Sequence, residues 1–351
     1  MKLLGFALLA LASMTFSCAS SSEREVEAVG LGDGVALPAR AGTVLVDGCV
    51  LDTWQTSTLA SAATRKVVQE VVLLCLVPRL DGTVGPRDPS ALLALGSLVQ
   101  KLQAEGYRVH LGISFTDESG QRYDGEQTGR FLASETWRTQ LVGSLAPLLG
   151  TAEGIELDLQ FLPNSAQADV TALVSALSTS LRPSRTLGIF VPPSTTSPSD
   201  IAGGDAFSRT ALAPFVDRMR IMTLDYSTSP GPTIDPGWAV DAVRFASNVP
   251  NIDIAYPLYG TDFGPDGHRS VTYTEAIGVS QIHGVPVSRG PTGAPHVAYD
   301  GHDLWFDDAD STGRALAAWS SDVLPLSVGV LFYGLGAEDP TLFEKLAARM
   351  P

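Results

Sequence analysis

Polar side chains alternate with apolar ones in one short run of the sequence, EGIELDLQ, which extends from Glu153 to Gln160. In a β-strand this spacing places Glu156, Asp158 and Gln160 on one face, because successive side chains point to opposite sides. Burying carboxylates costs several kcal/mol unless they are paired or hydrogen-bonded, so a purely structural role is the weaker interpretation. Of the three, the Gln160 carboxamide can donate a hydrogen bond but has no proton to transfer.

This run falls in the fourth of eight short apolar segments that alternate with amphipathic helical patterns. The eight expected strands are Thr43–Val50, Val71–Val77, Arg108–Ser114, Gly154–Gln160, Thr186–Val191, Met219–Asp225, Asn251–Pro257 and Val328–Tyr333. Near-continuous apolar strands separated by helices indicate a buried parallel sheet, and eight such units predict an α/β fold, a closed (β/α)8 TIM barrel. In such barrels the polar residues at the C-terminal ends of the strands face the functional mouth.

A small insertion is expected between strands 7 and 8 of the barrel. There, Pro286–Asp308 has the pattern of two short strands, His296–Tyr299 and Asp303–Phe306, around the turn Asp300-Gly301. Because (β/α)8 barrels routinely form one domain of about 250 residues, residues 42–351 are predicted to be a single barrel domain.

The first eighteen residues, MKLLGFALLALASMTFSC, have the pattern of a secretion signal: Lys2, then an apolar run too short to span a membrane. The end of this segment resembles a bacterial lipobox with Cys18 as the lipid acceptor, and cleavage by an ordinary signal peptidase is the alternative. Residues 19–41 are rich in Ser, Glu and Gly and are predicted to be a flexible tether. We therefore expect export to the bacterial cell envelope, lipid-anchored in the outer membrane or facing the periplasm, with membrane contact through the anchor only.

Two further cysteines, Cys49 and Cys75, fall at or near the ends of consecutive predicted strands. In an oxidising compartment they are able to form a disulfide. Two buried free thiols acting as small apolar residues are the equally weighted alternative.

The charge balance and the motifs exclude several classes of function. The 38 acidic residues outnumber the 23 basic ones, giving a net charge of −15 without a dense Lys/Arg run, which argues against nucleic acid as a partner. A neutral glycan is not repelled by such a surface. The five His residues show no HxxH or HExxH spacing and no GxGxxG motif occurs, so neither a metal nor a cofactor is predicted.

The segment EGIELDLQFLP, Glu153–Pro163, resembles the fourth-strand signature D-G-x-D-x-D-x-E of glycoside hydrolase family 18, the family of many chitinases. Other family motifs follow in the same order, and together the resemblance extends over roughly residues 43 to 348. The supporting segments are Leu111–Ser114, Phe131–Arg138, Arg220–Tyr226 (RIMTLDY), Tyr256–Gly260 (YPLYG), His296–Trp319 and Gly329–Leu335 (GVLFYGL).

The resemblance implies a substrate-assisted retaining mechanism, in which the substrate's own N-acetyl group is the nucleophile. Asp158 matches the carboxylate that orients this group, Glu156 matches the outer Asp behind it, and Asp225 matches the sixth-strand Asp. Tyr259 belongs to the seventh-strand motif and is a candidate sugar contact. Tyr333 stands where the family usually has the Trp that forms the floor under the sugar.

The departures from the family pattern fall at the reacting centre. Gln160 occupies the position of the Glu that protonates the glycosidic oxygen, and losing general acid catalysis typically costs roughly 10²–10⁴-fold in rate. Leu224 replaces a sixth-strand Tyr that holds the acetamido oxygen, for which the neighbouring Tyr226 is a partial substitute. The leading hypothesis is a barrel that binds β-linked N-acetylglucosamine glycans, with hydrolysis impaired or lost.

Two alternatives remain open at this point. One is an active glycoside hydrolase of the chitinase or endo-N-acetylglucosaminidase type, in which Glu156, Asp117, Glu118 or Asp262 substitutes for the missing acid. The other is a non-catalytic scaffold lipoprotein without a glycan site, since fold does not dictate function.

Overall fold

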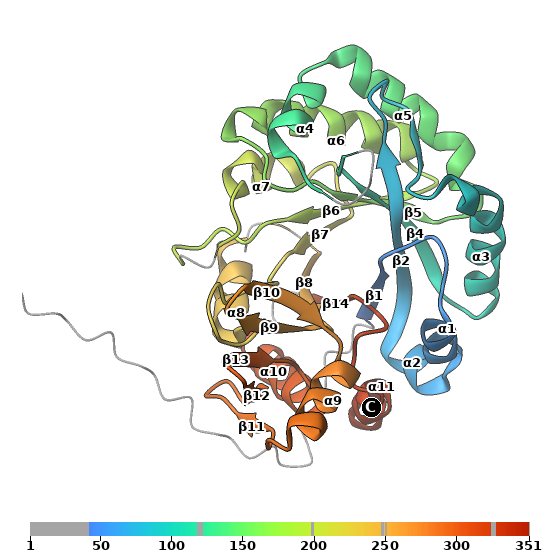
Figure 1. The fold of residues 1–351 in the computed structure, drawn as a ribbon. Coiled ribbons are helices and arrows are strands. Elements are labelled where there is room, and N and C mark those ends of the chain that lie inside the picture. Colours follow the sequence, from blue (N-terminus) through green and yellow to red (C-terminus); the bar gives the residue numbers. More distant parts are fainter. Residues whose placement is uncertain are drawn as a thin grey trace, which may run out of the picture. The chain divides into compact units, whose positions relative to one another are not determined.

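Eight parallel strands close into a barrel, and strand pairing runs β1-β14-β8-β7-β6-β5-β4-β2 and back to β1 (Figure 1). These strands are β1 (Gly42–Val46), β2 (Val68–Pro78), β4 (Arg108–Ser114), β5 (Gly154–Asp158), β6 (Thr186–Val191), β7 (Arg218–Ile221), β8 (Ile252–Pro257) and β14 (Gly329–Tyr333). A short strand, β3 (Val84–Pro86), pairs antiparallel with the end of β2. The predicted (β/α)8 TIM barrel is therefore confirmed.

The computed structural model describes residues 42–117, 122–197, 200–246, 249, 251–323 and 328–350. All of them belong to one unit of the chain, residues 34–351. The predicted signal segment 1–18 and tether 19–41 lie outside the described residues. Within the described ranges, no helix has both the length and the apolar character needed to cross a bilayer.

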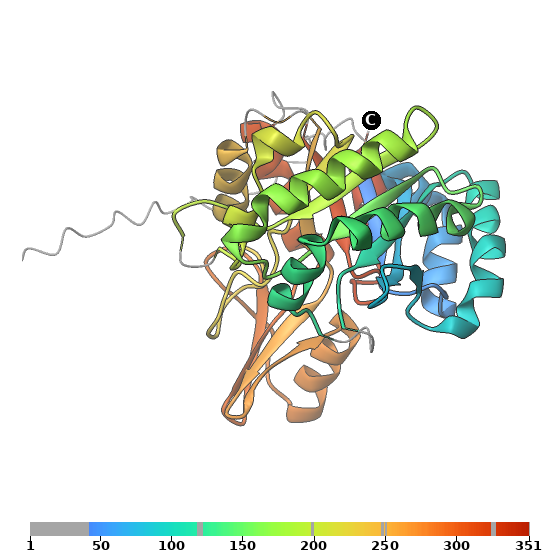
Figure 2. The same ribbon diagram turned by 90° about the horizontal axis from the view of Figure 1, so that it is seen from above.

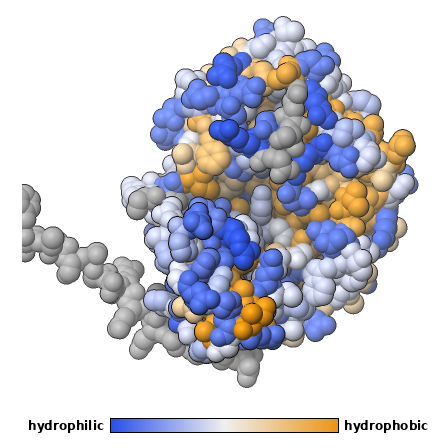
Figure 3. Space-filling model, viewed as in Figure 1, coloured by the Kyte–Doolittle hydropathy of each residue, from blue (hydrophilic) through white to orange (hydrophobic). Residues whose placement is uncertain are grey.

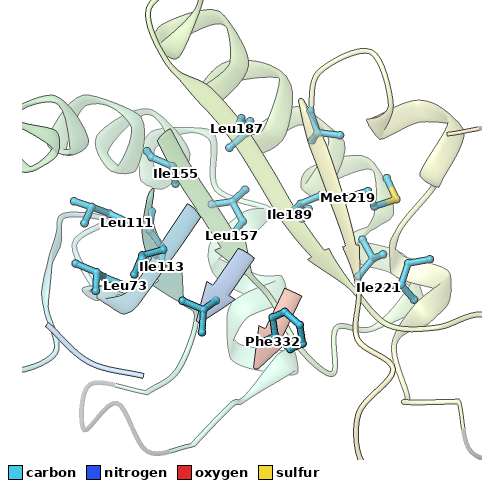
Figure 4. Close-up of a cluster of buried hydrophobic side chains, with 14 of the residues drawn as sticks. Leu73, Leu111, Ile113, Ile155, Leu157, Leu187, Ile189, Met219, Ile221 and Phe332 are labelled. Carbon is cyan, nitrogen blue, oxygen red and sulfur yellow. The ribbon is translucent and has the colours of Figure 1, made fainter. Parts of the chain in front are cut away.

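Helices cover the outside of the barrel. They are α1 (Thr53–Ala60), α2 (Ala62–Val67), α3 (Leu92–Ala104), α4 (Gly125–Leu132), α5 (Glu135–Leu149), α6 (Gln167–Leu181), α7 (Arg209–Leu212), α8 (Pro236–Phe245), α10 (Ala309–Val323) and α11 (Leu342–Arg349), with short 3₁₀ turns at Pro89–Ala91, Asn164–Ala166 and Gly204–Ala206. Side chains such as Ile155 and Leu157 of β5 belong to the large apolar core between sheet and helices (Figure 4). Because strand side chains alternate, the intervening Glu156 and Asp158 point into the barrel.

The insertion predicted between strands 7 and 8 is present, and it is larger than expected. It forms a five-stranded antiparallel sheet in the order β10-β9-β13-β12-β11, together with helix α9 (Tyr273–His283). Its strands are β9 (Gly260–Gly264), β10 (Gly267–Val271), β11 (Ser288–Arg289), β12 (Pro295–Tyr299) and β13 (His302–Trp305). Strand β10 escaped the sequence analysis because four of its five side chains are exposed and give no apolar signal. Figure 2 shows the insertion projecting from the end of the barrel at which β8 ends.

Three strands end earlier than the sequence pattern indicated, and β1 is one of them, ending at Val46 instead of Val50. Strand β5 ends at Asp158 instead of Gln160, and β7 ends at Ile221 instead of Asp225. Beyond them the backbone turns out of the sheet, because Phe161 and Asp225 adopt positive φ angles of 55° and 54°. Such angles are uncommon for non-glycine residues and suit turns, not strands.

A disulfide joins Cys49, which follows β1, to Cys75 in β2. The structure thus selects the bonded alternative over two free thiols.

Candidate functional site

Asp158 is the centre of a hydrogen-bonded group at the C-terminal end of β5. Its side chain is only 1% exposed, and it accepts hydrogen bonds from the Tyr123 hydroxyl and from Nε2 of Gln160, the latter at 3.1 Å. Burial raises the pKa of the Asp158 carboxyl to about 6, although both donors act in the opposite direction. The structure therefore brings Asp158 and Gln160 together as predicted, with the amide bound to the carboxylate.

Tyr123 is a member of this group that the sequence analysis missed. It lies in the segment between β4 and α4, where it forms an isolated bridge with Thr116. Burial and the Asp158 charge raise the pKa of the Tyr123 hydroxyl, so it remains a hydrogen-bond donor. Its ring also packs edge-on against Phe161, the half-exposed aromatic that follows Gln160.

A glycine allows these two segments to approach each other. A Cβ at Gly125, the first residue of α4, would lie 1.8 Å from the Phe161 carbonyl oxygen. Any larger residue there would separate the start of α4 from the turn after β5. Gly125 therefore positions Tyr123, two residues before it, next to Asp158.

Three further predicted residues meet on the other side of the mouth. The Tyr259 hydroxyl donates to Oδ1 of Asp225 at 2.7 Å. The Tyr259 ring packs edge-on against Tyr333 at 6.4 Å between ring centroids, and Tyr333 packs in the same way against Phe190 at 6.5 Å. Burial and then the Asp158 charge raise the pKa of Tyr333, which indicates that its ring lies near the first group.

Apolar side chains line the barrel interior below these groups. They are Leu45, Val72, Leu74, Phe190, Met222, Leu224, Ala255 and Leu331, with Tyr333 packed against them. Leu224, the residue in place of the sixth-strand Tyr, is thus part of this apolar layer. Figure 3 shows the corresponding face of the barrel hollowed near its middle.

Tyr226 has a different environment from the one its sequence position suggested. Its ring packs against Trp238 of α8, with 5.3 Å between ring centroids. The backbone amide of Tyr226 donates to the carbonyl of Thr233. The ring of Tyr226 therefore packs against the outer helix α8.

Glu156 lies one strand repeat deeper than Asp158, in a buried layer of charges around Arg220. The fully buried Arg220 guanidinium donates to Glu70, to Glu156 at 2.7 Å and to Asp253 at 2.6 Å. His110 Nδ1 lies 2.9 Å from the Glu156 carboxylate. Burial alone would raise the pKa of Glu156, but Arg220 and His110 outweigh it, so the pKa is lowered. An ionised carboxylate with a lowered pKa has no proton to donate. The environment of Glu156 therefore indicates a structural charge and not a substitute acid.

The other candidate acids have other surroundings or lie outside the described residues. Asp262 is buried in the insertion, where it accepts from the Tyr299 hydroxyl at 2.8 Å and lies 3.0 Å from His302 Nδ1. Asp117 lines a pocket beside α4. Glu118 is outside the described residues.

One buried trio has the donor chemistry of a metal site. Potential ligand atoms of Glu70, His110 and Glu156 lie within 4.8 Å of one another. Arg220 donates to both carboxylates, so its guanidinium supplies the positive charge that a metal would otherwise bring. These residues therefore do not fit a metal ion.

The chain folds as a (β/α)8 barrel, and solved structures of chitinases share this fold. No protein-family model and no curated protein matches the chain. Among solved structures, a chitinase from Chromobacterium violaceum has a TM-score of 0.74 at 19% identity, covering 88% of this chain and 99% of that one. The Bacillus cereus spore cortex-lytic enzyme SleL has a TM-score of 0.74 at 17% identity, covering 89% of this chain and 74% of that one.

Two further structures contain sugar. A family 18 chitinase from Cycas revoluta in complex with (GlcNAc)3 has a TM-score of 0.68 at 14% identity, covering 88% of this chain and 99% of that one. A double mutant of the Cycas enzyme, in which one exchange replaces Glu by Gln, is in complex with (GlcNAc)4 and has a TM-score of 0.69 at 14% identity. Identities this low establish the fold, and the predicted resemblance to glycoside hydrolase family 18 is confirmed at that level.

Proposed function

We propose that this chain is an exported, chitinase-like barrel that binds β-linked N-acetylglucosamine glycans and hydrolyses them slowly or not at all. The main observation is the Gln160 amide bound to Asp158 at the position where the resemblance places a proton donor. Hydrogen bonding and stacking, which binding requires, survive this exchange, whereas proton transfer does not.

The geometry supports particular roles at the mouth. The Asp158 carboxylate is suited to accept a hydrogen bond from the sugar's acetamido N–H, with Tyr123 and Gln160 fixing its orientation. The Tyr333 ring provides an aromatic surface beside it, on which the apolar face of a sugar can stack. Asp225, held by Tyr259, provides a second carboxylate for sugar hydroxyls.

The sugar-bound structures support the choice of ligand. A barrel of this fold holds (GlcNAc)3, and a variant with a Glu-to-Gln exchange holds (GlcNAc)4. Such an exchange is thus compatible with oligosaccharide binding on this fold.

Export and lipidation are part of the same proposal. The signal-like segment 1–18 with Cys18 supports an anchor in the cell envelope. The Cys49–Cys75 disulfide supports an oxidising compartment outside the cytoplasm, because such bonds are rare in reducing ones.

Native mass spectrometry of the purified chain with chito-oligosaccharides of four to six units tests the binding, because it reports complexes and cleavage products together. We expect intact complexes with little product. The variant Tyr333→Ala should strongly reduce the complexes, whereas Phe245→Ala, which removes an aromatic ring that is 61% exposed on α8, should retain them.

The other possible outcomes of this experiment test the two alternatives, an active hydrolase and a scaffold. Rapid shortening of the oligomers would show an active hydrolase with a substitute acid and overturn the proposed loss of activity. If cleavage is slow, Gln160→Glu should raise its rate by roughly 10²-fold or more, because it restores a group able to transfer a proton. If no oligomer forms complexes or gives products, the scaffold alternative is favoured.

A further inference from the structure

A separate pocket of about 210 Å³ opens beside the segment that links β4 to α4. It is lined by Pro78, Arg79 and Leu80 after β2, by Phe115, Thr116 and Asp117 after β4, and by Asp124, Gln127, Thr128 and Phe131 in and before α4. This space is large enough for one pyranose ring.

The lining combines aromatic faces with neutral and acidic polar groups. The side chains of Asp117, Asp124 and Gln127 supply acceptors and an amide donor, and Phe115 and Phe131 supply apolar surface. Together these side chains offer a sugar ring both hydrogen-bond partners and apolar surface.

The charges around the pocket select against anionic sugars. Among the described lining residues, Arg79 is the cation, and it donates to the carbonyl of Pro86 at 2.9 Å. The Asp124 carboxylate, which accepts from the backbone amide of Gln127, disfavours an anionic ligand. A neutral ring with several hydroxyl groups matches both the acceptors and the apolar surface.

The pocket and the mouth share one segment of backbone. The amide of Phe115 donates to the carbonyl of Asp158 at 3.0 Å, and Thr116 pairs with Tyr123, whose hydroxyl donates to the Asp158 side chain. A ligand in the pocket would therefore contact residues adjacent to those that position Asp158.

We propose that this pocket is a second carbohydrate site, which binds one neutral pyranose unit independently of the barrel mouth. The choice of an N-acetylglucosamine-type sugar rests on the proposed function, whereas the existence of a neutral sugar site rests on the pocket's own lining.

Trp137 reports on this pocket directly. Its indole Nε1–H donates to the carbonyl of Arg79 at 3.1 Å, and its ring stacks on Phe131 at 5.4 Å between centroids. The indole N–H resonance of Trp137, assigned with a Trp137→Phe variant, can be followed by NMR while N-acetylglucosamine monosaccharide is added to the full chain.

We expect the Trp137 resonance to shift and saturate in the natural chain and in the mouth variant Tyr333→Ala. The variant Gln127→Phe fills the pocket from α4 and should weaken this response by about tenfold or more. Glu126→Phe makes the same exchange one residue earlier, at an exposed position of the same helix, and should respond like the natural chain.

The opposite results separate the two proposals. A silent Trp137 in a chain that forms complexes with (GlcNAc)4 would overturn the pocket proposal and leave the proposed function standing. A response that persists in Gln127→Phe, or disappears in Tyr333→Ala, would show transmission from the mouth and also overturn it. A Trp137 response without (GlcNAc)4 complexes would support the pocket and reject binding at the mouth.

Discussion

Two carboxylates on one face of β5, Glu156 and Asp158, are buried to the same degree and yet have opposite electrostatic environments. Glu156 contacts the Arg220 guanidinium and His110, and its pKa is lowered. Asp158, one strand repeat closer to the mouth, receives hydrogen bonds only from the neutral groups of Tyr123 and Gln160 among the bonds that the structure defines, and its pKa rises to about 6.

The difference separates a structural charge from one that is suited to a functional role. A buried carboxylate that already has a cationic partner contributes to the fold and has nothing left to offer a ligand. A buried carboxylate held by neutral donors is oriented but not neutralised, which is typical of residues that take part in binding or proton transfer. Within one strand, the groups that surround each carboxylate decide between the two roles.

Removing Arg220 should have the largest effect. Arg220→Met leaves three buried carboxylates, Glu70, Glu156 and Asp253, without their shared cation. We expect a loss of roughly 3–5 kcal/mol in the free energy of unfolding, measured by urea denaturation. The control Arg244→Met, in an exposed pair with Asp241, should change it by less than about 0.5 kcal/mol. Equal effects of the two variants would contradict the structural role of the buried layer.

Neutralising each carboxylate of β5 should shift stability in opposite directions at pH 8. Glu156→Gln removes a charge that is stabilised by Arg220 and should destabilise the fold by about 2–4 kcal/mol. Asp158→Asn removes a charge that burial disfavours and should stabilise the fold by about 1–3 kcal/mol, while weakening glycan binding. Destabilisation by both substitutions would show that Asp158 is as fully compensated as Glu156.

The gain from Asp158→Asn should depend on pH. The pKa of Asp158 rises from its ordinary value of 3.8 to about 6 in the folded chain, so protonation favours the folded state. This contribution to stability is fully present below about pH 4 and is lost as the pH rises through 6, a change of about 3 kcal/mol. The advantage of the variant should therefore disappear near pH 4 in paired urea titrations. An advantage that is constant from pH 4 to pH 8 would exclude titration of Asp158 as its cause.

Much of the fold was predictable because its strands are locally distinct. The limits of β4 and β6, Arg108–Ser114 and Thr186–Val191, match the prediction, since each is an apolar run bounded by polar residues. The residues at the mouth were predictable for a related reason, because parallel strands in a barrel bring their C-terminal ends together. Asp158 followed from this rule and the order of the strands, whereas Tyr333 came from the resemblance of the last strand to the family motif.

The partners of these residues were not predictable, because they depend on strand register and loop closure. Arg220 bonds to Glu70, which is 150 residues away, and nothing local in either segment indicates the pairing. Tyr123 lies in a polar connection without periodicity and reaches Asp158 only because Gly125 permits a close approach of the backbones. Without those partners, Glu156 and Asp158 look equivalent in the sequence.

Removing the Tyr123 hydroxyl should have a smaller effect, concentrated on Asp158. Tyr123→Phe deletes a donor that favours the ionised carboxylate, so the pKa of Asp158 should rise further. Hydrogen bonds to charged groups contribute about 1.5–3 kcal/mol, and we expect (GlcNAc)4 binding to weaken by roughly tenfold at pH 6 and less at pH 8. Calorimetric titrations at the two pH values measure this difference. An equal loss at both would indicate that the hydroxyl contacts the sugar directly.

The smallest effect is expected at Tyr226, where sequence position and structure suggest different roles. The resemblance offers its hydroxyl as a substitute for the one missing at Leu224, but its ring packs against Trp238 of α8. Tyr226→Phe preserves that ring contact, so the affinity for (GlcNAc)4 should stay within about twofold, less than 0.5 kcal/mol. Tyr259→Phe, which removes a donor to Asp225, should weaken binding more. If the order is reversed, Tyr226 binds the acetamido group after all, and the mouth is closer to the family's arrangement than Leu224 suggests.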